Sequence, residues 1–249
     1  MEALLKLFDG YSRKARLYPA LLSLAPIVWT ALLACGVAPG NIAAEGLIAL
    51  VVTLGGTYLL ANLARSRGKL LEERLKETWG GWPTTLLLRH ANTSLDPYTK
   101  ARYHETLTKL TGLTMPTEAE ERARQKDCDH RYRAATTKLL ELRRDAKYKM
   151  LHQENAAYGF RRNLLGLKPV ALVILMATIL LAVFQLISGL DMLSITAIKS
   201  DLAMRWHLYL ALALDLAALA IWLTCITPFF VRQGADEYAM ALLRTLDMP

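Results

Sequence analysis

Residues 170–187 read VALVILMATILLAVFQLI, and a matching apolar segment, GLIALVVTLGGTYLLANL, occupies residues 46–63. A helix needs about 20 apolar residues to cross a bilayer, so each segment is close to that length. Two further apolar runs lack Lys and Arg, which places the four predicted spans at 18–37, 47–64, 170–190 and 208–231. The sequence therefore predicts an all-α protein with four transmembrane helices and a long segment between the second and the third.

The distribution of charge orients these spans. Although 53% of the 249 residues are hydrophobic, the chain has a net charge of +8. Segment 65–168 holds 22 Lys and Arg against 13 Asp and Glu. The link at 38–45 holds no basic residue, and the link at 191–206 holds two. Because basic loops stay on the cytoplasmic side of a membrane, we expect both termini and segment 65–168 to be cytoplasmic.

This topology divides the chain into five parts. We expect an amphipathic cytoplasmic leader at 1–17, a transmembrane hairpin at 18–64 and a basic helical cytoplasmic domain at 65–168. A second transmembrane hairpin follows at 169–231, and a short helical tail at 232–249 ends the chain.

Cap and turn residues predict the helices of the cytoplasmic domain. The helix of the second span is expected to continue past the membrane until Gly80 and Gly81 break it. Asp96 before Pro97, with Gly112 as the stop, predicts a helix at 97–111, and residues 84–93 are expected to form a link.

A capping-box pair, Thr117 and Glu120, opens the next predicted helix. We expect this polar helix to run over 118–158, with a kink near 127–130, and to end at Gly159. Residues 160–168 are then expected to form a basic elbow before Pro169 opens the third span.

No arrangement of residues predicts catalysis. The five histidines have no metal-ligand spacing, and the three cysteines lie far apart. Asp129 and His130 resemble an acid and a base, but adjacent residues on a helix point about 100° apart. We therefore predict that the protein is not an enzyme and uses no cofactor or metal.

Asp215 is the only acid in the predicted spans. A carboxylate in the hydrocarbon costs on the order of 3 kcal/mol, so it should face protein or water. One interpretation is a pore or gate group, joined by Gln185, Thr53 and Thr57, and in an oligomer Asp215 would form a ring. The other is a buried acid that is either neutral or hydrogen-bonded, with Gln185, at a similar depth, as the expected partner. For the threonines, which flank two glycines, helix packing is the interpretation that we favour.

The basic residues of the cytoplasmic domain also allow two interpretations. They attract anionic membrane lipid, or several of them hold a phosphate-rich ligand while a tyrosine stacks on a base. The candidate nucleotide-binding residues are Arg143, Arg144, Lys147, Tyr148, Arg161 and Arg162. Composition alone favours lipid or a solvated surface.

Three motifs carry a resemblance to a known family. They are YGFRRNL with GLKP (158–164, 166–169), GGWPTT (80–85), and Thr99-Lys100 followed by Arg102-Tyr103-His104. The chain resembles the four-span membrane effectors of prokaryotic anti-phage systems, in which a nucleotidyltransferase makes a cyclic or linear oligonucleotide messenger. The effector then permeabilises or depolarises the bacterial inner membrane, which is the basis of abortive infection.

This resemblance implies a function and a set of partners. The protein would be a multi-pass ion channel or pore-forming effector, gated by a nucleotide bound to the cytoplasmic domain. It would assemble as a homo-oligomer, with a tetramer as the first expectation, because four plain spans enclose little pore alone. The alternative is a non-conducting scaffold or partner-docking protein whose basic segment binds anionic lipid.

Overall fold

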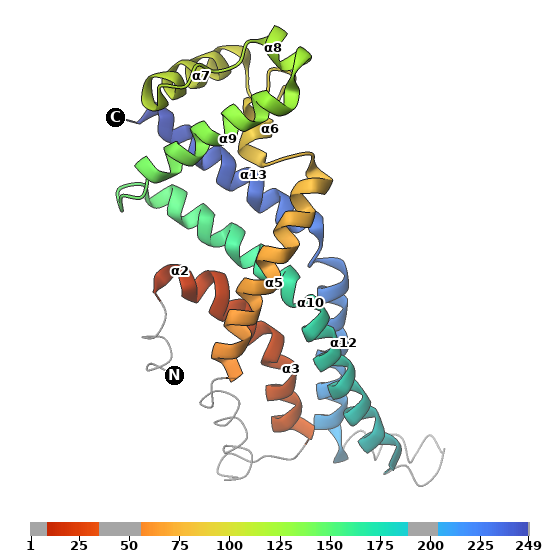
Figure 1. Ribbon diagram of the computed structural model, residues 1–249. Helices are drawn as coiled ribbons and strands as arrows, with labels where there is room; N and C mark the ends of the chain where they lie inside the picture. Colours follow the sequence, from red (N-terminus) through yellow and green to blue (C-terminus); the bar gives the residue numbers. More distant parts are fainter. Residues whose placement is uncertain (1–8, 35–55, 189–203, 249) are drawn as a thin grey trace. The chain divides into compact units, whose positions relative to one another are not determined.

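The computed structural model describes residues 9–34, 56–188 and 204–248, and within these ranges every regular element is a helix (Figure 1). The predicted all-α class is confirmed for this part of the chain. Unit 1 comprises Met1–Lys69 and Phe160–Thr227, and unit 2 comprises Leu70–Gly159 and Pro228–Pro249. Helices α5 (Gly56–Trp79) and α10 (Lys149–Ser188) contribute residues to both units.

Unit 1 contains the apolar helices. A continuous helical stretch begins with α2 (Gly10–Ser12), passes through a π-helical turn, η1 (Arg13–Leu17), and ends with α3 (Tyr18–Ala34). The unit also contains the first part of α5, most of α10 and α12 (Trp206–Thr224). Among the residues that the structure describes, three helices are long and apolar enough to cross a membrane: Gly10–Leu33, Lys149–Ser188 and Trp206–Thr224. They overlap the first, third and fourth predicted spans. Of the second, 47–64, the first half (47–55) lies outside the described residues, and 56–64 forms the beginning of α5.

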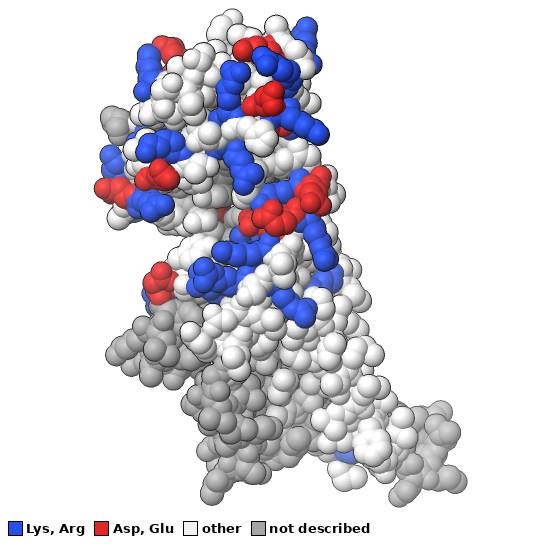
Figure 2. All heavy atoms as spheres, in the orientation of Figure 1, with Lys and Arg blue, Asp and Glu red and all other residues white. Residues whose placement is uncertain are grey.

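Large apolar side chains cover the surface of these helices. Phe184 on α10 is 69% exposed, and Val173, Leu180 and Ile221 are exposed as well. In α12 and in the part of α10 after Lys168, Asp215 is the only Lys, Arg, Asp or Glu residue. On the face that Figure 2 shows, Lys and Arg gather over unit 2 and over the polar part of α5. An apolar surface of this extent is typical of a protein that meets lipid, so unit 1 has the character of a membrane-embedded unit.

The predicted polar helix over 118–158 is wrong, because the chain breaks it twice. Its parts are α8 (Glu118–Ala123), α9 (Gln125–Leu142) and the beginning of α10. Arg124, at φ −144° and ψ 61°, separates the first two, so the break precedes the expected kink region. The second break is a turn in which the Asp145 carboxylate accepts the backbone N–H of Lys147 at 2.8 Å. Such local bonds compete with the helical pattern.

The expected stop at Gly159 and the elbow at 160–168 are also wrong. Helix α10 continues through Gly159 and through Pro169 to Ser188. A glycine inside a helix costs about 1 kcal/mol. The burial of neighbours such as Tyr158, Leu164 and Leu167 outweighs this cost.

The fourth predicted span ends earlier than expected. Helix α12 ends at Thr224, and α13 (Pro228–Arg244) begins with a proline in its first turn, a position that proline favours. Lys168 donates from Nζ to the carbonyls of Leu223, at 3.3 Å, and Ile226, at 2.8 Å. A lysine near a helix C-terminus satisfies carbonyls that lack helical partners, so Lys168 stabilises the break between the helices.

Unit 2 confirms the strongest local predictions. Helix α7 spans Pro97–Thr111, with the Asp96 carboxylate accepting from the N–H of Thr99 and Gly112 in the left-handed region. The capping box of Thr117 and Glu120 is present at the start of α8. The expected link at 84–93 is only partly a link, because α6 (Pro83–Leu88) occupies its beginning.

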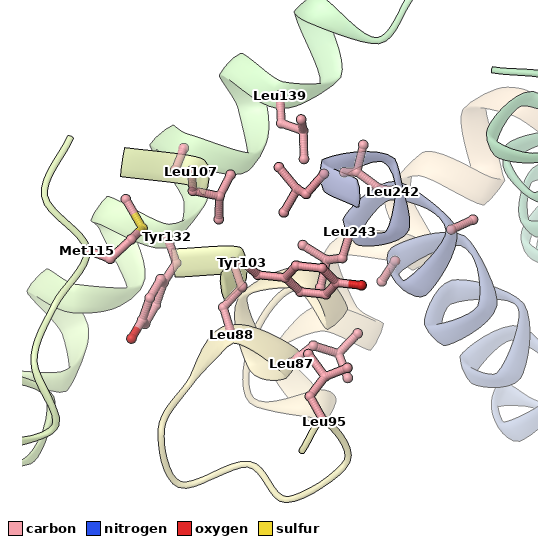
Figure 3. Packing of buried hydrophobic residues seen from close by; sticks show 14 of the residues in the cluster. Leu87, Leu88, Leu95, Tyr103, Leu107, Met115, Tyr132, Leu139, Leu242 and Leu243 are labelled. Carbon is pink, nitrogen blue, oxygen red and sulfur yellow. The ribbon is translucent and has the colours of Figure 1, made fainter. Parts of the chain in front are cut away.

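Helices α6, α7, α9 and α13 enclose the core of unit 2 (Figure 3). Leu88, Leu107, Tyr132, Leu139 and Leu243 are completely buried there. A short 3₁₀ turn, η2 (Thr245–Asp247), closes the chain against this core through the buried Leu246. The C-terminal tail is therefore part of the folded unit rather than an appendage to the last span.

Candidate functional site

Asp215 lies fully buried in unit 1, between α3 and α12. Its Oδ1 accepts a hydrogen bond from the indole Nε1 of Trp29 at 2.7 Å, and its Oδ2 accepts one from the hydroxyl of Thr30 at 3.2 Å. Ala211, one turn earlier on α12, is also completely buried and leaves room for the carboxylate. The acid thus joins the first predicted span to the fourth.

The partners of Asp215 differ from the expected one. Gln185 is not among them, and its backbone carbonyl instead accepts from Nη1 of Arg205 at 3.1 Å. Thr53, the further gate candidate, lies outside the described residues, as does the side chain of Thr57. The enclosure of Asp215 agrees with the interpretation of a buried, hydrogen-bonded acid, whereas its role in a pore stays a prediction. Composition gave no sign of the indole donor.

A close helix crossing in unit 1 involves a residue of the GLKP motif. A Cβ atom on Gly166 of α10 would lie 2.8 Å from the backbone nitrogen of Gly68 on α5. Beside this contact, the amide Nδ2 of the buried Asn163 donates to the carbonyl of Ala15 at 2.6 Å. Ala15 belongs to the π-helical turn η1. Three helices therefore meet at Gly68, Asn163, Gly166 and Ala15, which we name the glycine junction.

The candidate nucleotide-binding residues belong to two units. Arg161 and Arg162 lie in unit 1, where Nε of Arg162 approaches Oδ1 of Asn163 at 3.4 Å. Arg143, Lys147 and Tyr148 lie in the α9–α10 turn of unit 2, together with the exposed Arg144.

The turn between α9 and α10 uses its basic residues internally. Nη1 of Arg143 donates to the Tyr148 hydroxyl at 2.6 Å, and Nη2 donates to the carbonyl of Thr245 at 3.2 Å. The Tyr148 ring is only 4% exposed, with the Arg143 guanidinium 5.0 Å and the Lys147 ammonium 5.1 Å from its centre. This arrangement offers no open ring face on Tyr148 for a base, so its proposed stacking role would require movement of the ring.

The other motif residues contact neighbouring elements of unit 2. Arg102 pairs with Asp247 through Nε–Oδ1 at 2.9 Å and Nη2–Oδ2 at 3.2 Å, and the Tyr103 hydroxyl donates to the same carboxylate at 3.3 Å. The Tyr158 hydroxyl donates to Glu72 at 2.6 Å, and its ring stacks on Tyr238. These motif positions therefore have structural contacts that explain them without a ligand.

Two buried cation-forming groups lie on α7. The Lys100 ammonium donates to the carbonyls of His90, at 3.1 Å, and Asn92, and burial lowers its pKa. Nε2 of His104 lies 2.8 Å from the carbonyl of Leu88, which requires a proton on that nitrogen. Burial lowers the pKa of His104, so the neutral ring is the form that the fold selects.

This burial predicts a loss of stability in mild acid. Because the unfolded state binds a proton on His104 more readily, stability is full above about pH 6.5, the ordinary histidine pKa. It falls as the pH decreases from there toward the lower folded pKa. We expect unit 2 of wild type to become protease-sensitive at lower urea concentration at pH 5.5 than at pH 7.5. His104→Gln, which does not titrate, should show a smaller difference, and equal differences in both proteins would refute this origin.

Comparison with protein-family models, with curated proteins and with solved structures finds no match. Within residues 9–34, 56–188 and 204–248, no group of His, Cys, Asp and Glu side chains could hold a metal ion. The features of the described residues that bear on function are the buried Asp215, the glycine junction and the basic surface of unit 2.

Proposed function

We propose that the protein is a multi-pass effector of the bacterial inner membrane that changes ion flux when a nucleotide binds its cytoplasmic unit. In this proposal it acts as a homo-oligomer, with a tetramer as the first expectation. A nucleotidyltransferase of the same anti-phage system supplies the cyclic or linear messenger. Unit 1 forms the conducting part, and unit 2 receives the ligand.

The observation that carries the proposal is the continuity of α10. The sequence predicted a stop at Gly159, yet the helix runs as 40 residues from the polar Lys149 to Ser188. Its apolar part begins after Lys168, so one helix contains both a polar surface segment and a membrane-length segment. A rigid helix transmits a rotation or shift of one end to the other, which supplies a physical path from ligand to membrane.

The glycine junction supports the same mechanism. Helices α5 and α10 cross at backbone contact, and Asn163 connects them to the π-helical turn before α3. Packed helices tend to move between discrete arrangements rather than deform continuously. A displacement of α10 would therefore be passed to both neighbours at this point.

Ion flux from liposomes that contain the purified protein tests the proposal. We expect at least one member of a panel of cyclic and linear oligonucleotides to change the flux, in either direction, relative to nucleoside controls. Protein-free liposomes with the same panel are the control for leakage. Equal flux in the presence and absence of every nucleotide would contradict the channel proposal and favour a non-conducting scaffold.

A further inference from the structure

A cationic pocket opens beside Trp82 in unit 2. The positive φ angles of Gly80 (77°) and Gly81 (141°) turn the chain between α5 and α6, and Trp82 follows directly. The Arg133 guanidinium lies 5.3 Å from the centre of the Trp82 ring, and the Lys76 ammonium lies 3.6 Å from it. The adjoining pocket has a volume of about 200 Å³ and is bounded by α9, by the turn at Gly81 and Trp82, and by Thr85 of α6.

The charge of this pocket is positive and uncompensated. Its only acid, Asp129, is held by Arg89 through Nε–Oδ1 at 2.9 Å and Nη2–Oδ2 at 2.6 Å. This pairing raises the pKa of Arg89 and offsets the carboxylate charge. Lys126 and Arg133 also line the pocket, and neither forms an ion pair with any residue that the structure describes. Two cations therefore remain for an anion.

A buried hydroxyl lines the same pocket. Thr85 is 3% exposed, and its Oγ1 has no hydrogen-bond partner within the described parts of the chain. Most buried polar atoms in folded proteins have a partner, and an unsatisfied one costs about 1–3 kcal/mol. Rotation about the Cα–Cβ bond of Thr85 would allow a ligand in the pocket to accept this hydrogen bond.

The pocket continues along the exposed face of α9. A neighbouring hollow of about 520 Å³ shares His130 and Arg133 with it and extends past Thr137 to Lys138 and Glu141, whose opposite charges pair at 3.4 Å. Lys126, His130, Arg133 and Thr137 follow at spacings of four, three and four residues, which places them on one face of the helix. We name this surface, from Trp82 and Thr85 to Thr137, the Trp82 trough.

We propose that the Trp82 trough binds the phosphate ester of a nucleotide. Lys126 and Arg133 supply the charge, and a guanidinium recognises phosphate oxygens with two parallel hydrogen bonds. Thr85 supplies a neutral donor, and Trp82 supplies an aromatic wall beside the cations. This site specifies where the ligand of the proposed function binds, and the identification of that ligand as a messenger rests on the proposed function. None of the six nucleotide-binding candidates from the sequence belongs to this site.

Binding of AMP, adenosine and glycerol phosphate to the purified full-length protein tests the site by calorimetry. We expect AMP to bind at least about tenfold more tightly than adenosine, because adenosine lacks the phosphate. AMP should also bind more tightly than glycerol phosphate, which has the phosphate of a lipid headgroup but no base. Equal affinity for AMP and glycerol phosphate would overturn the assignment to a nucleotide.

Two double variants provide a matched comparison. Lys126→Gln with Arg133→Gln should weaken AMP binding by about tenfold or more. Arg74→Gln with Lys149→Gln, which removes the same charge from exposed positions of unit 2 that do not line the trough, should leave it unchanged. Equal losses in the two variants would reduce the site to general electrostatics and overturn it, as would the absence of AMP binding to wild type at millimolar concentration.

Thr85→Val separates binding from folding. Because the hydroxyl has no described partner, its replacement by a methyl group of similar shape should leave thermal stability unchanged or raised. AMP affinity should nevertheless fall by a few-fold, and unchanged affinity would refute the role of this hydroxyl. AMP binding at the trough without any flux response would contradict the proposed function and leave the site intact. A flux response that survives in the Lys126→Gln, Arg133→Gln variant would contradict the site alone.

Discussion

Replacement of Gly166 by Val is expected to separate α5 from α10 and to destabilise unit 1 severely. Even the Cβ of alanine would lie 2.8 Å from the nitrogen of Gly68 and 3.1 Å from its Cα. Those neighbours are backbone atoms, which cannot rotate away as a side chain can. Overpacking of this kind costs about 1–3 kcal/mol for small additions, and alanine regains only about 1 kcal/mol in helix propensity.

The measurement is the thermal unfolding of the purified variants in detergent, followed by loss of helical circular dichroism. We expect the order of stability wild type, Gly166→Ala, Gly166→Val, with the last unfolded or aggregated at temperatures where wild type is intact. Gly10→Ala is the matched control, since a Cβ at Gly10 of α2 meets no atom within 4 Å. If Gly166→Ala unfolds at the same temperature as Gly10→Ala, the helices do not cross at backbone contact.

A double-mutant cycle examines the second part of the glycine junction. A Cβ on Gly68 would lie 2.1 Å from Oδ1 of Asn163, whose amide nitrogen is bonded to Ala15. Gly68→Ala must therefore displace Asn163, so Gly68→Ala and Asn163→Ala should destabilise the protein by less together than the sum of the two single effects. Additive effects would mean that the two residues act independently.

Local signals made helix α7 predictable from the sequence. Asp96, Pro97 and Gly112 are a cap, a first-turn proline and a left-handed stop, and each acts within its own turn of chain. The same local rules wrongly predicted that the helix ends at Gly159. They count the free-energy cost of a glycine inside a helix but not the packing of the residues on either side of it. The chain leaves the helical conformation at Arg124, between α8 and α9. Arginine is common inside helices, so its presence there did not predict a break.

The sites were less predictable because their partners are distant in the chain. Hydropathy was sufficient to identify Asp215 as an acid in an apolar run, but Trp29, its donor, lies 186 residues away. Gly166 was part of a quoted motif, yet its importance depends on Gly68, which no pattern pairs with it. The basic residues of the α9–α10 turn were identified by charge alone. Charge does not distinguish Arg143, which is hydrogen-bonded within unit 2, from Arg133, which forms no ion pair with the described residues.

Replacement of Asp215 by Ala is expected to destabilise the contact between α3 and α12 by about 2–4 kcal/mol. In the wild type, the indole N–H of Trp29 donates to Oδ1 of Asp215 at 2.7 Å, and the change removes this acceptor. It also opens a cavity at a fully buried position. The Thr30 hydroxyl recovers part of its loss, because a threonine in a helix can bond to its own preceding turn.

Asp215→Asn distinguishes the structural role from a role in conduction. Asparagine keeps an oxygen for Trp29, and its amide can donate to the Thr30 hydroxyl, so thermal unfolding in detergent should differ from wild type by less than about 1 kcal/mol. Because the carboxylate is 0% exposed and both oxygens are bonded to α3, we expect the ion selectivity of liposome currents to be unchanged. Rings of acidic side chains on a conduction path set cation selectivity. A loss of cation preference in Asp215→Asn, with stability preserved, would therefore place this carboxylate on the path and require α3 to move away from it when the channel conducts.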